Sequence, residues 1–462
     1  MNGAAYMDSS SSLSVEELYL LERKLCAFLL EGGYKTAAVF GKTSSAVFAA
    51  IRACLLTGVC YIPVDAETPA KRLGEMLSCA DAVLYDGEKP PCGIPCADIR
   101  CCAEGYEPLG TLPTVPDCRA AYIIFTSGTT GVPKGIRVSR KNLRCFADWL
   151  LSLPAIREEK PRSVLNQARF SFDLSVAGIC CSLFGGMDFA APEQPLLTDF
   201  PKLFAFMENS GAEMAVLTPS FAEMCLCDSS FCGELLPRLR VLFFCGETLK
   251  PSTARKLILR FPKARIINAY GPTEATCAVC ACEITADMTA AALPVGEIGS
   301  AASEIHILTP DNREAKEGEI GEILICGDSA AEYINAEGGF SVIDGSRCFH
   351  TGDLGYTAEG RLYFCGRRDR QVKLLGHRIE LSDIENSLCE ISGVRRAAAA
   401  VETKGGFPVI TAVIEAEKGV SEALIKQEMK KLLPSYMLPR KILLTDSIPI
   451  NANGKTTTGA LL

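Results

Sequence analysis

The sequence contains few histidines, no long hydrophobic run and no dense block of basic residues. Its formal net charge is −8, so nucleic acid is not expected as a partner. The longest apolar run, Leu174–Met187, lies between two aspartates and is shorter than the roughly 20 residues that a membrane span requires. We therefore expect this run to form a buried helix, and we expect no membrane span.

The start of the chain also lacks the basic residues and apolar stretch of a secretory signal, although cysteine is abundant. There are 23 cysteines, and most lie among apolar neighbours. Disulfide frameworks are typical of short secreted chains, so we expect these thiols to be small buried hydrophobes in a reducing cytoplasm. None of the three histidines is adjacent to either close cysteine group, so zinc is not expected. The two groups are Cys277, Cys280 and Cys282, and Cys92, Cys96, Cys101 and Cys102.

Short apolar runs alternate with helix-like segments over the first part of the chain. Ser14 and Glu17 have the spacing of a capping box and predict a helix from Ser14 to about Leu30. The alternation predicts β-α units and a largely parallel sheet. Its expected strands include Thr36–Phe40, Cys60–Val64, Ala82–Tyr85, Met214–Leu217, Val241–Phe244 and Ile266–Asn268.

The pattern changes twice in the second half of the chain. Glycine-rich turns between alternating segments predict a small antiparallel β subdomain from about Pro294 to Phe364. After Asp369 the pattern is α+β. We therefore predict an α/β fold with two domains: a large N-terminal domain, residues 1–367, with parallel and mixed sheets and the β subdomain, and a small, mobile C-terminal domain, residues 368–462.

A loop rich in hydroxyl groups and glycine follows the strand-like segment Ala121–Phe125. It reads Thr126-Ser127-Gly128-Thr129-Thr130-Gly131, and Lys134 follows it. Glycines let a backbone approach a ligand closely, and successive N–H and hydroxyl groups bind anions. The spacing is not that of a Walker A loop. Taken alone, the loop is compatible with either a polyphosphate site or an ordinary turn.

The segment TSGTTGVPKG resembles the phosphate-loop signature of the adenylate-forming superfamily, which includes acyl-CoA synthetases, luciferases and peptide-synthetase adenylation domains. Other motifs of that superfamily follow the expected order along nearly the whole chain. Several segments, LFFCGETL among them, are most similar to the D-alanine–carrier protein ligases, which act in teichoic-acid modification. The further motifs are Leu56–Asp65, Phe172–Ser175, Asn268–Thr276, Thr351–Leu354, Gly366–Leu381, Leu433–Pro439 and Asn453–Lys455.

The resemblance implies a cytoplasmic ligase that uses ATP and Mg²⁺ to activate a small amino acid, with D-alanine as the expected substrate, and passes it to a phosphopantetheine thiol on a carrier protein. Tyr270 would stack on adenine, Asp353 and Arg367 would bind the ribose, and Glu274 would be the Mg²⁺ ligand. The remaining ATP-binding positions would be Thr126, Ser127, Gly128, Thr129, Thr130, Lys134, Asn268, Ala269, Gly271 and Thr273.

The resemblance also assigns a substrate pocket and a moving domain. Asp173 would bind the substrate ammonium group, beside Leu174, and Cys245 with Gly246 would lie near the α-carbon and help select the D enantiomer. Lys455 would bridge the substrate carboxylate and the α-phosphate in the transition state. Asp369 would be the hinge, and Gly376 would line the tunnel for the attacking thiol.

Departures from the carrier-ligase pattern leave alternatives open. Ala177 and Gly178 follow the FDLSV segment, near the expected side-chain pocket. The chain could therefore be a peptide-synthetase-type adenylation enzyme for another small amino acid, such as glycine, L-alanine, serine or cysteine. A nucleotide-binding protein without catalysis is a third hypothesis, which the presence of Lys455, Glu274 and Asp353 disfavours. Asp173 disfavours an acyl-CoA synthetase.

Overall fold

The computed structural model describes residues 4–128, 132–343, 345–374, 376–404, 407–417, 419–445 and 448. Its contacts divide the chain into two compact units. Unit 1 comprises Met1–Ala66, Cys79–Ile124 and Ile136–Arg368, and unit 2 comprises Glu67–Ser78, Phe125–Gly135 and Asp369–Leu462. The phosphate-loop segment thus belongs, by its contacts, to unit 2.

The capping-box prediction is confirmed at the first helix, α1 (Val15–Glu31). The Ser14 hydroxyl accepts a hydrogen bond from the Glu17 N–H, and the Glu17 carboxylate accepts one from the Ser14 N–H at 2.8 Å. These bonds satisfy backbone donors that have no partner inside the helix. The apolar run after Asp173 is also a buried helix, α7 (Leu174–Leu183), as its composition predicts.

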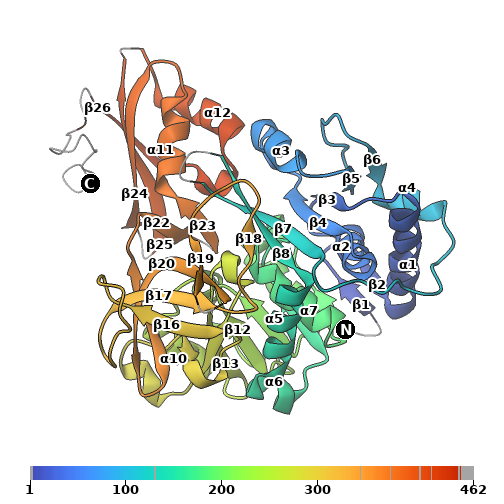
Figure 1. Ribbon diagram of the computed structural model, residues 1–462, viewed down its shortest axis with the longest axis horizontal. Coiled ribbons are helices and arrows are strands. Elements are labelled where there is room, and N and C mark those ends of the chain that lie inside the picture. Colours follow the sequence, from blue (N-terminus) through green and yellow to red (C-terminus); the bar gives the residue numbers. More distant parts are fainter. Residues whose placement is uncertain are drawn as a thin grey trace. The chain divides into compact units, whose positions relative to one another are not determined.

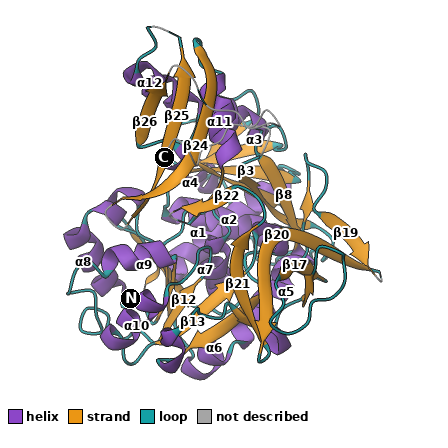
Figure 2. Ribbon diagram, turned by 90° about the vertical axis from the view of Figure 1, so that its left-hand side faces the viewer, coloured by secondary structure: helices purple, strands orange, loops and turns teal. Residues whose placement is uncertain are grey.

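Unit 1 contains an eight-stranded mixed sheet with the order β14-β13-β12-β11-β9-β10-β1-β2. Its six central strands are parallel, and the two edge strands, β14 and β2, are antiparallel to their neighbours. The carboxyl ends of β12 and β13 (Figure 2) lead into the segments that carry Cys245 and Gly271. The strands are β1 (Ala4–Met7), β2 (Ser12–Ser14), β9 (Ser163–Asn166), β10 (Asp188–Ala190), β11 (Met214–Leu217), β12 (Val241–Phe244), β13 (Arg265–Tyr270) and β14 (Cys280–Ile284).

A seven-stranded sheet has the order β18-β8-β7-β4-β3-β5-β6, in which the pairs from β7 to β6 are parallel. Its strands are β3 (Thr36–Gly41), β4 (Cys60–Asp65), β5 (Ala82–Tyr85), β6 (Cys96–Asp98), β7 (Ala120–Thr126), β8 (Lys134–Ser139) and β18 (Glu332–Tyr333). The remaining helices of unit 1 are α2 (Ser45–Thr57), α4 (Ile99–Glu104), α5 (Arg140–Ser152), α6 (Pro154–Glu159), α8 (Phe200–Ser210), α9 (Pro219–Cys225) and α10 (Pro251–Arg260).

Two apolar cores hold these sheets in place. The larger core joins residues of both sheets to helices α1, α2, α5 and α7, and nearly every residue of α2 is buried. The second core packs α8, α9 and α10 against the eight-stranded sheet. Sheets buried in this way read as continuous apolar runs rather than alternating ones, which is why the strands could be recognised in the sequence.

The predicted antiparallel β subdomain is a third sheet of unit 1. It consists of β15 (Gly296–Glu297), β16 (Glu304–Leu308), β17 (Gly321–Cys326), β19 (Phe340–Ile343), β20 (Ser346–Ala358) and β21 (Arg361–Arg367). β20 lies between β17 and β21, so the Thr351–Leu354 motif is held at the middle of this sheet.

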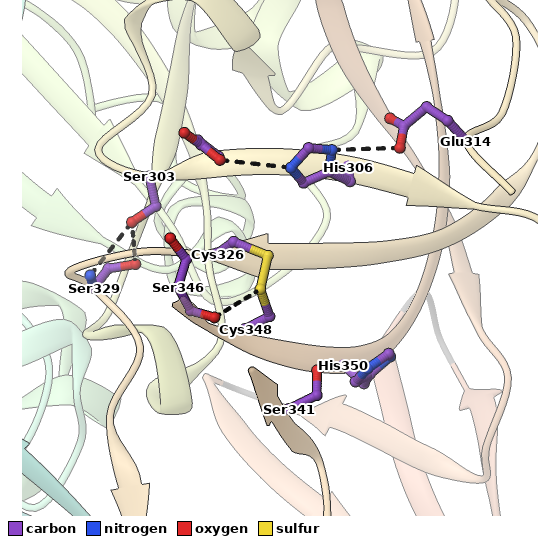
Figure 3. The surroundings of a disulfide bond; sticks show 10 residues. Ser303, His306, Glu314, Cys326, Ser329, Ser341, Ser346, Cys348 and His350 are labelled. Carbon is purple, nitrogen blue, oxygen red and sulfur yellow. Dashed lines mark hydrogen bonds and ion pairs between the residues drawn. A yellow bond between two sulfur atoms is a disulfide. The ribbon is translucent and has the colours of Figure 1, made fainter. Parts of the chain in front are cut away.

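One cysteine pair contradicts the prediction that the thiols stay reduced. Cys326 on β17 and Cys348 on β20 form a disulfide (Figure 3). The cause is strand register, because the two residues face each other directly across the ladder. The sequence could not reveal this register, since a turn and two further strands separate the two cysteines.

Unit 2 has its own apolar core. Helices α11 (Leu381–Cys389) and α12 (Glu422–Leu432) pack on the three-stranded sheet of β24 (Val394–Lys404), β25 (Phe407–Ala416) and β26 (Lys441–Thr445) (Figure 1). The hairpin of β22 (Gln371–Leu374) and β23 (His377–Glu380) and helix α3 (Ala70–Leu77) complete the unit. In the described part of the whole chain, no helix has the length and apolarity to cross a membrane.

Candidate active site

A tight turn follows β13 and carries most of the predicted adenine and magnesium motif. A Cβ on Gly271 would lie 2.5 Å from the Ala278 Cα and 2.9 Å from the Cys277 carbonyl oxygen. Thr276 and Cys277 both have positive φ angles, 59° and 73°, and the Ala278 N–H donates to the Thr276 carbonyl. Such backbone is costly for residues with a side chain and is found where function requires it. The turn therefore folds back on Gly271, and only glycine fits there.

The turn places Tyr270 against the middle of the third sheet. The Tyr270 hydroxyl donates to Asp353 Oδ2 at 2.7 Å, and the Arg367 guanidinium pairs with Asp353 Oδ1. Asp353 is 2% exposed. Burial, followed by the Asp353 charge, raises the pKa of Tyr270 well above its usual value, so this hydroxyl remains a donor. Two predicted nucleotide-binding residues, Tyr270 and Arg367, thus meet at the buried carboxylate of a third, Asp353.

Glu274 is a second buried carboxylate, 1% exposed. Its Oε1 accepts a hydrogen bond from the Tyr333 hydroxyl at 2.6 Å, and its backbone carbonyl accepts one from the Ala331 N–H. Sequence reasoning missed Tyr333. It lies on the short edge strand β18, far along the chain from Glu274, and no neighbouring residue marks it as part of a site.

Asp173 lies directly before α7, where an aspartate would ordinarily cap the helix. Here its side chain makes no cap bond, and Oδ2 instead accepts a hydrogen bond from the Thr273 hydroxyl at 2.6 Å. The carboxylate is therefore directed to the turn after β13 rather than to its own helix. The next residue, Leu174, is the first residue of α7 and is buried.

Cys245 is buried at the carboxyl end of β12, and its thiol donates to the Cys277 carbonyl oxygen at 3.7 Å. Gly246 follows with a φ of 91°, which favours glycine. Burial raises the pKa of Cys277 well above its usual value, and the charges of Cys245 and Asp173 add to the effect. Cys277 thus connects the predicted substrate residues, although the sequence alone did not select it.

The carboxyl end of β13 also contributes Asn268 and Ala269, which are both buried. The Asn268 amide nitrogen donates to the Pro294 carbonyl at 2.8 Å. Its Oδ1 is buried and has no hydrogen-bond partner among the described residues. A buried acceptor of this kind is costly unless a ligand or water supplies a donor.

The phosphate-loop residues belong to unit 2. Thr126 ends β7, and the Ser127 hydroxyl donates to the Arg378 carbonyl at 3.0 Å and accepts from the Glu380 N–H at 2.9 Å. At Gly128, a Cβ would lie 2.0 Å from the Val132 carbonyl oxygen, so only glycine fits at this position. The two hydrogen bonds of Ser127 to β23 were not expected from the sequence.

Lys134 is the first residue of β8. Burial raises the pKa of Glu380, and the positive charge of Lys134 partly opposes this rise. In the same unit, Asp369 accepts a hydrogen bond from the Gln371 N–H at 3.2 Å, and Gly376 has a φ of 83° in the turn of the β22–β23 hairpin. Thr129, Thr130 and Lys455 lie outside the described residues.

Two family models match the sequence. The AMP-binding enzyme model covers residues 2–333, and the AMP-binding enzyme C-terminal domain model covers residues 383–455. A D-alanine–D-alanyl carrier protein ligase of Bacillus licheniformis is 36% identical over 476 residues, covering 98% of this chain and 94% of that protein. A protein of the same name from Bacillus cytotoxicus is 37% identical over 451 residues, covering 92% of this chain and 88% of its own.

Solved structures of adenylation domains share the fold. Holo-PA1221, a protein with adenylation and carrier (PCP) domains, has a TM-score of 0.85 at 25% identity, covering 99% of this chain and 81% of that one. The Vibrio cholerae adenylation domain AlmE, solved with glycyl-adenosine-5'-phosphate, has a TM-score of 0.85 at 24% identity, covering 100% and 94%. The predicted α/β fold class is confirmed by these likenesses.

The turn at Gly271 yields a test of the site's construction. Gly271→Ala should lower the free energy of unfolding by about 1–3 kcal/mol or more, because the new methyl group meets backbone atoms that cannot move aside. Urea unfolding followed by circular dichroism measures the change. Gly105→Ala is the control, since its Cβ would meet no atom closer than 3.8 Å. Equal stability of the two variants would contradict the steric account.

Proposed function

The chain belongs to the AMP-binding enzyme family of adenylate-forming ligases, and we propose that it activates D-alanine and loads it onto a carrier protein. In the first step the amino acid carboxylate would attack the α-phosphate of ATP, forming an aminoacyl adenylate and releasing pyrophosphate. In the second, the phosphopantetheine thiol of the carrier would attack the acyl carbon and release AMP. We place the reaction in the cytoplasm, where ATP is available.

The hydrogen bond between Asp173 and Thr273 is the observation that carries the choice of an amino acid. It holds a carboxylate next to the nucleotide motif rather than at its own helix. Asp173 is partly buried, and a carboxylate withdrawn from water is stabilised by a nearby cation. An α-ammonium group is such a cation, whereas a fatty acid would supply none.

Cys245 supports the D enantiomer. Its thiol donates a hydrogen bond to the Cys277 carbonyl oxygen. Asp173 lies close enough to Cys277 for its charge to raise the pKa of the Cys277 thiol. A small, immobile side chain at this place would leave room for a methyl group on one side of the α-carbon. The curated relatives, which are 36–37% identical, carry the name D-alanine–D-alanyl carrier protein ligase.

The residues of unit 1 fit an adenine nucleotide. Asp353, already oriented by Tyr270 and Arg367, would accept hydrogen bonds from the ribose hydroxyls. The unpartnered Asn268 Oδ1 would accept one from the adenine amino group. Glu274 offers the hard oxygen ligand that Mg²⁺ prefers, and that ion would neutralise charge on the phosphates when bound.

The residues of unit 2 would complete the reaction. Thr126, Ser127, Thr129, Thr130 and Lys134 would hold the β- and γ-phosphates. Lys455 would stabilise the negative charge that develops between the carboxylate and the α-phosphate. Asp369 would act as the hinge that withdraws Lys455 before thiol attack, and Gly376 would keep the thiol path open.

A second candidate substrate is another small amino acid, as in peptide-synthetase adenylation enzymes. Ala177 and Gly178 on α7 are both small residues. A larger residue does not fit at Gly178, because its Cβ would come within 3.0 Å of Asn166 and Phe189. The AlmE structure contains a glycyl adenylate, so the fold accommodates a substrate smaller than alanine. The substrate preference separates these two candidates.

Amino acid-dependent pyrophosphate exchange should be strongest with D-alanine. We expect D-alanine to exceed L-alanine and glycine by about tenfold or more in kcat/KM, the usual scale for discrimination of one small group by a shaped pocket. The panel comprises the twenty amino acids and their D forms. A preference for glycine or an L amino acid would favour the second candidate and overturn the first.

Cys245→Ala should reduce the ratio of D-alanine to L-alanine activity by about tenfold, because the pocket wall beside the α-carbon would lose its sulfur. Both substrates are compared in the exchange assay. Cys225→Ala is the matched control, since Cys225 is equally buried but belongs to the second core, which packs α8, α9 and α10. An unchanged ratio would assign Cys245 a packing role only.

Lys455→Ala should lower the rate of adenylate formation by about 10²–10³-fold, the scale for removal of one group that stabilises developing charge. Transfer from chemically supplied D-alanyl adenylate to the carrier should be largely retained. Lys431→Ala, on the exposed face of α12, is the control. Equal losses in both half-reactions would contradict the proposed role.

A further inference from the structure

Cys92 and Cys96 form a close dithiol away from the candidate active site. Their sulfur atoms are 3.1 Å apart, about 1 Å longer than a disulfide bond. Both side chains are half-buried, so small solutes can reach them. They lie in unit 1, on the loop between β5 and β6 and on the first residue of β6.

Backbone contacts hold the two thiols facing each other. Cys96 pairs with Val83 in the ladder between β5 and β6, and the Val83 N–H donates to the Pro95 carbonyl at 2.8 Å. The Ile94 carbonyl accepts from both thiols, at 3.3 Å from the Cys96 sulfur and 3.9 Å from that of Cys92. Strand β6 therefore fixes the Cys96 sulfur, and the short loop before β6 holds the Cys92 sulfur beside it.

We propose that Cys92 and Cys96 are a reversible redox site that exchanges with low-molecular-weight disulfides. The Cys92 thiolate attacks the small disulfide, forming a mixed disulfide and releasing one thiolate. Cys96 then gives its proton to solvent and attacks the Cys92 sulfur, which releases the second thiolate. The protein loses two electrons and two protons, and the small disulfide is reduced to two thiols.

The order of attack follows from the environment of the pair. Cys96 is fixed on β6 and Cys92 lies on the loop before it, and burial with the hydrogen bond to Cys92 raises the pKa of Cys96 to about 11, so we assign Cys96 the second, resolving step. Burial, followed by the charges of Cys181 and Asp148, raises the pKa of Cys180 well above its usual value, and this thiol is shielded from solvent. The pair thus combines access with a resolving partner, which marks a redox-active thiol.

A metal site is a weaker interpretation of the same residues. In the described ranges, no group of three or more histidine, cysteine, aspartate or glutamate side chains is placed to hold a metal ion. A structural zinc ion takes four protein ligands, and this pair supplies two. Two-electron exchange needs only the two sulfurs.

The test uses the intact wild-type protein, equilibrated with defined ratios of reduced to oxidised glutathione, alkylated and mapped by peptide mass spectrometry. We expect an intramolecular Cys92–Cys96 disulfide to form at a lower proportion of oxidised glutathione than adducts on the exposed, single thiols of Cys118 and Cys227. Added dithiothreitol should reverse it.

Variants distinguish the attacking sulfur from the resolving one. Cys96→Ser should trap glutathione on Cys92, whereas Cys92→Ser should leave Cys96 modified at least about tenfold more slowly. Cys227→Ser is the control and should leave the Cys92–Cys96 disulfide unchanged. Separate glutathione adducts on both cysteines in the wild type, a cross-link to another cysteine, or no modification when Cys118 is modified would each overturn the proposal.

Discussion

The close approach of Gly271 to the backbone of Cys277 and Ala278 is the constraint on which the site in unit 1 depends. It reverses the chain immediately after β13, and from this one short segment Tyr270, Thr273 and Glu274 bond to three different partners. The same reversal presents the Cys277 carbonyl to the Cys245 thiol. Nucleotide contacts and substrate contacts are therefore set by a single backbone conformation, and a change in one would displace the other.

Three carboxylates in this site are oriented before any ligand arrives. Asp173 accepts from Thr273, Glu274 accepts from Tyr333, and Asp353 lies between Tyr270 and Arg367. Carboxylates held in this way need little reorganisation when a cation or hydroxyl group approaches, which is the basis of electrostatic preorganisation. The protein bears the cost of burying Glu274 and Asp353 during folding rather than during the reaction.

Much of the fold was predictable because its signals are local. The capping box before α1, the apolar runs of the buried strands and the glycine-rich turns of the third sheet all occur within short windows of sequence. Three features were not predictable: the Tyr333 bond to Glu274, the Ser127 bonds to β23, and the Cys326–Cys348 disulfide. Each joins residues far apart in sequence, and depends on which strands become neighbours and in what register.

The buried thiols of unit 1 show how little chemistry a high cysteine content needs to imply. Desolvation raises the pKa of Cys26, Cys60 and Cys225 to about 12, so these side chains remain uncharged at any physiological pH. A thiol that neither ionises nor meets solvent is, to its neighbours, a small apolar group. A high content of such buried thiols therefore says little about the redox state of the compartment in which the protein works.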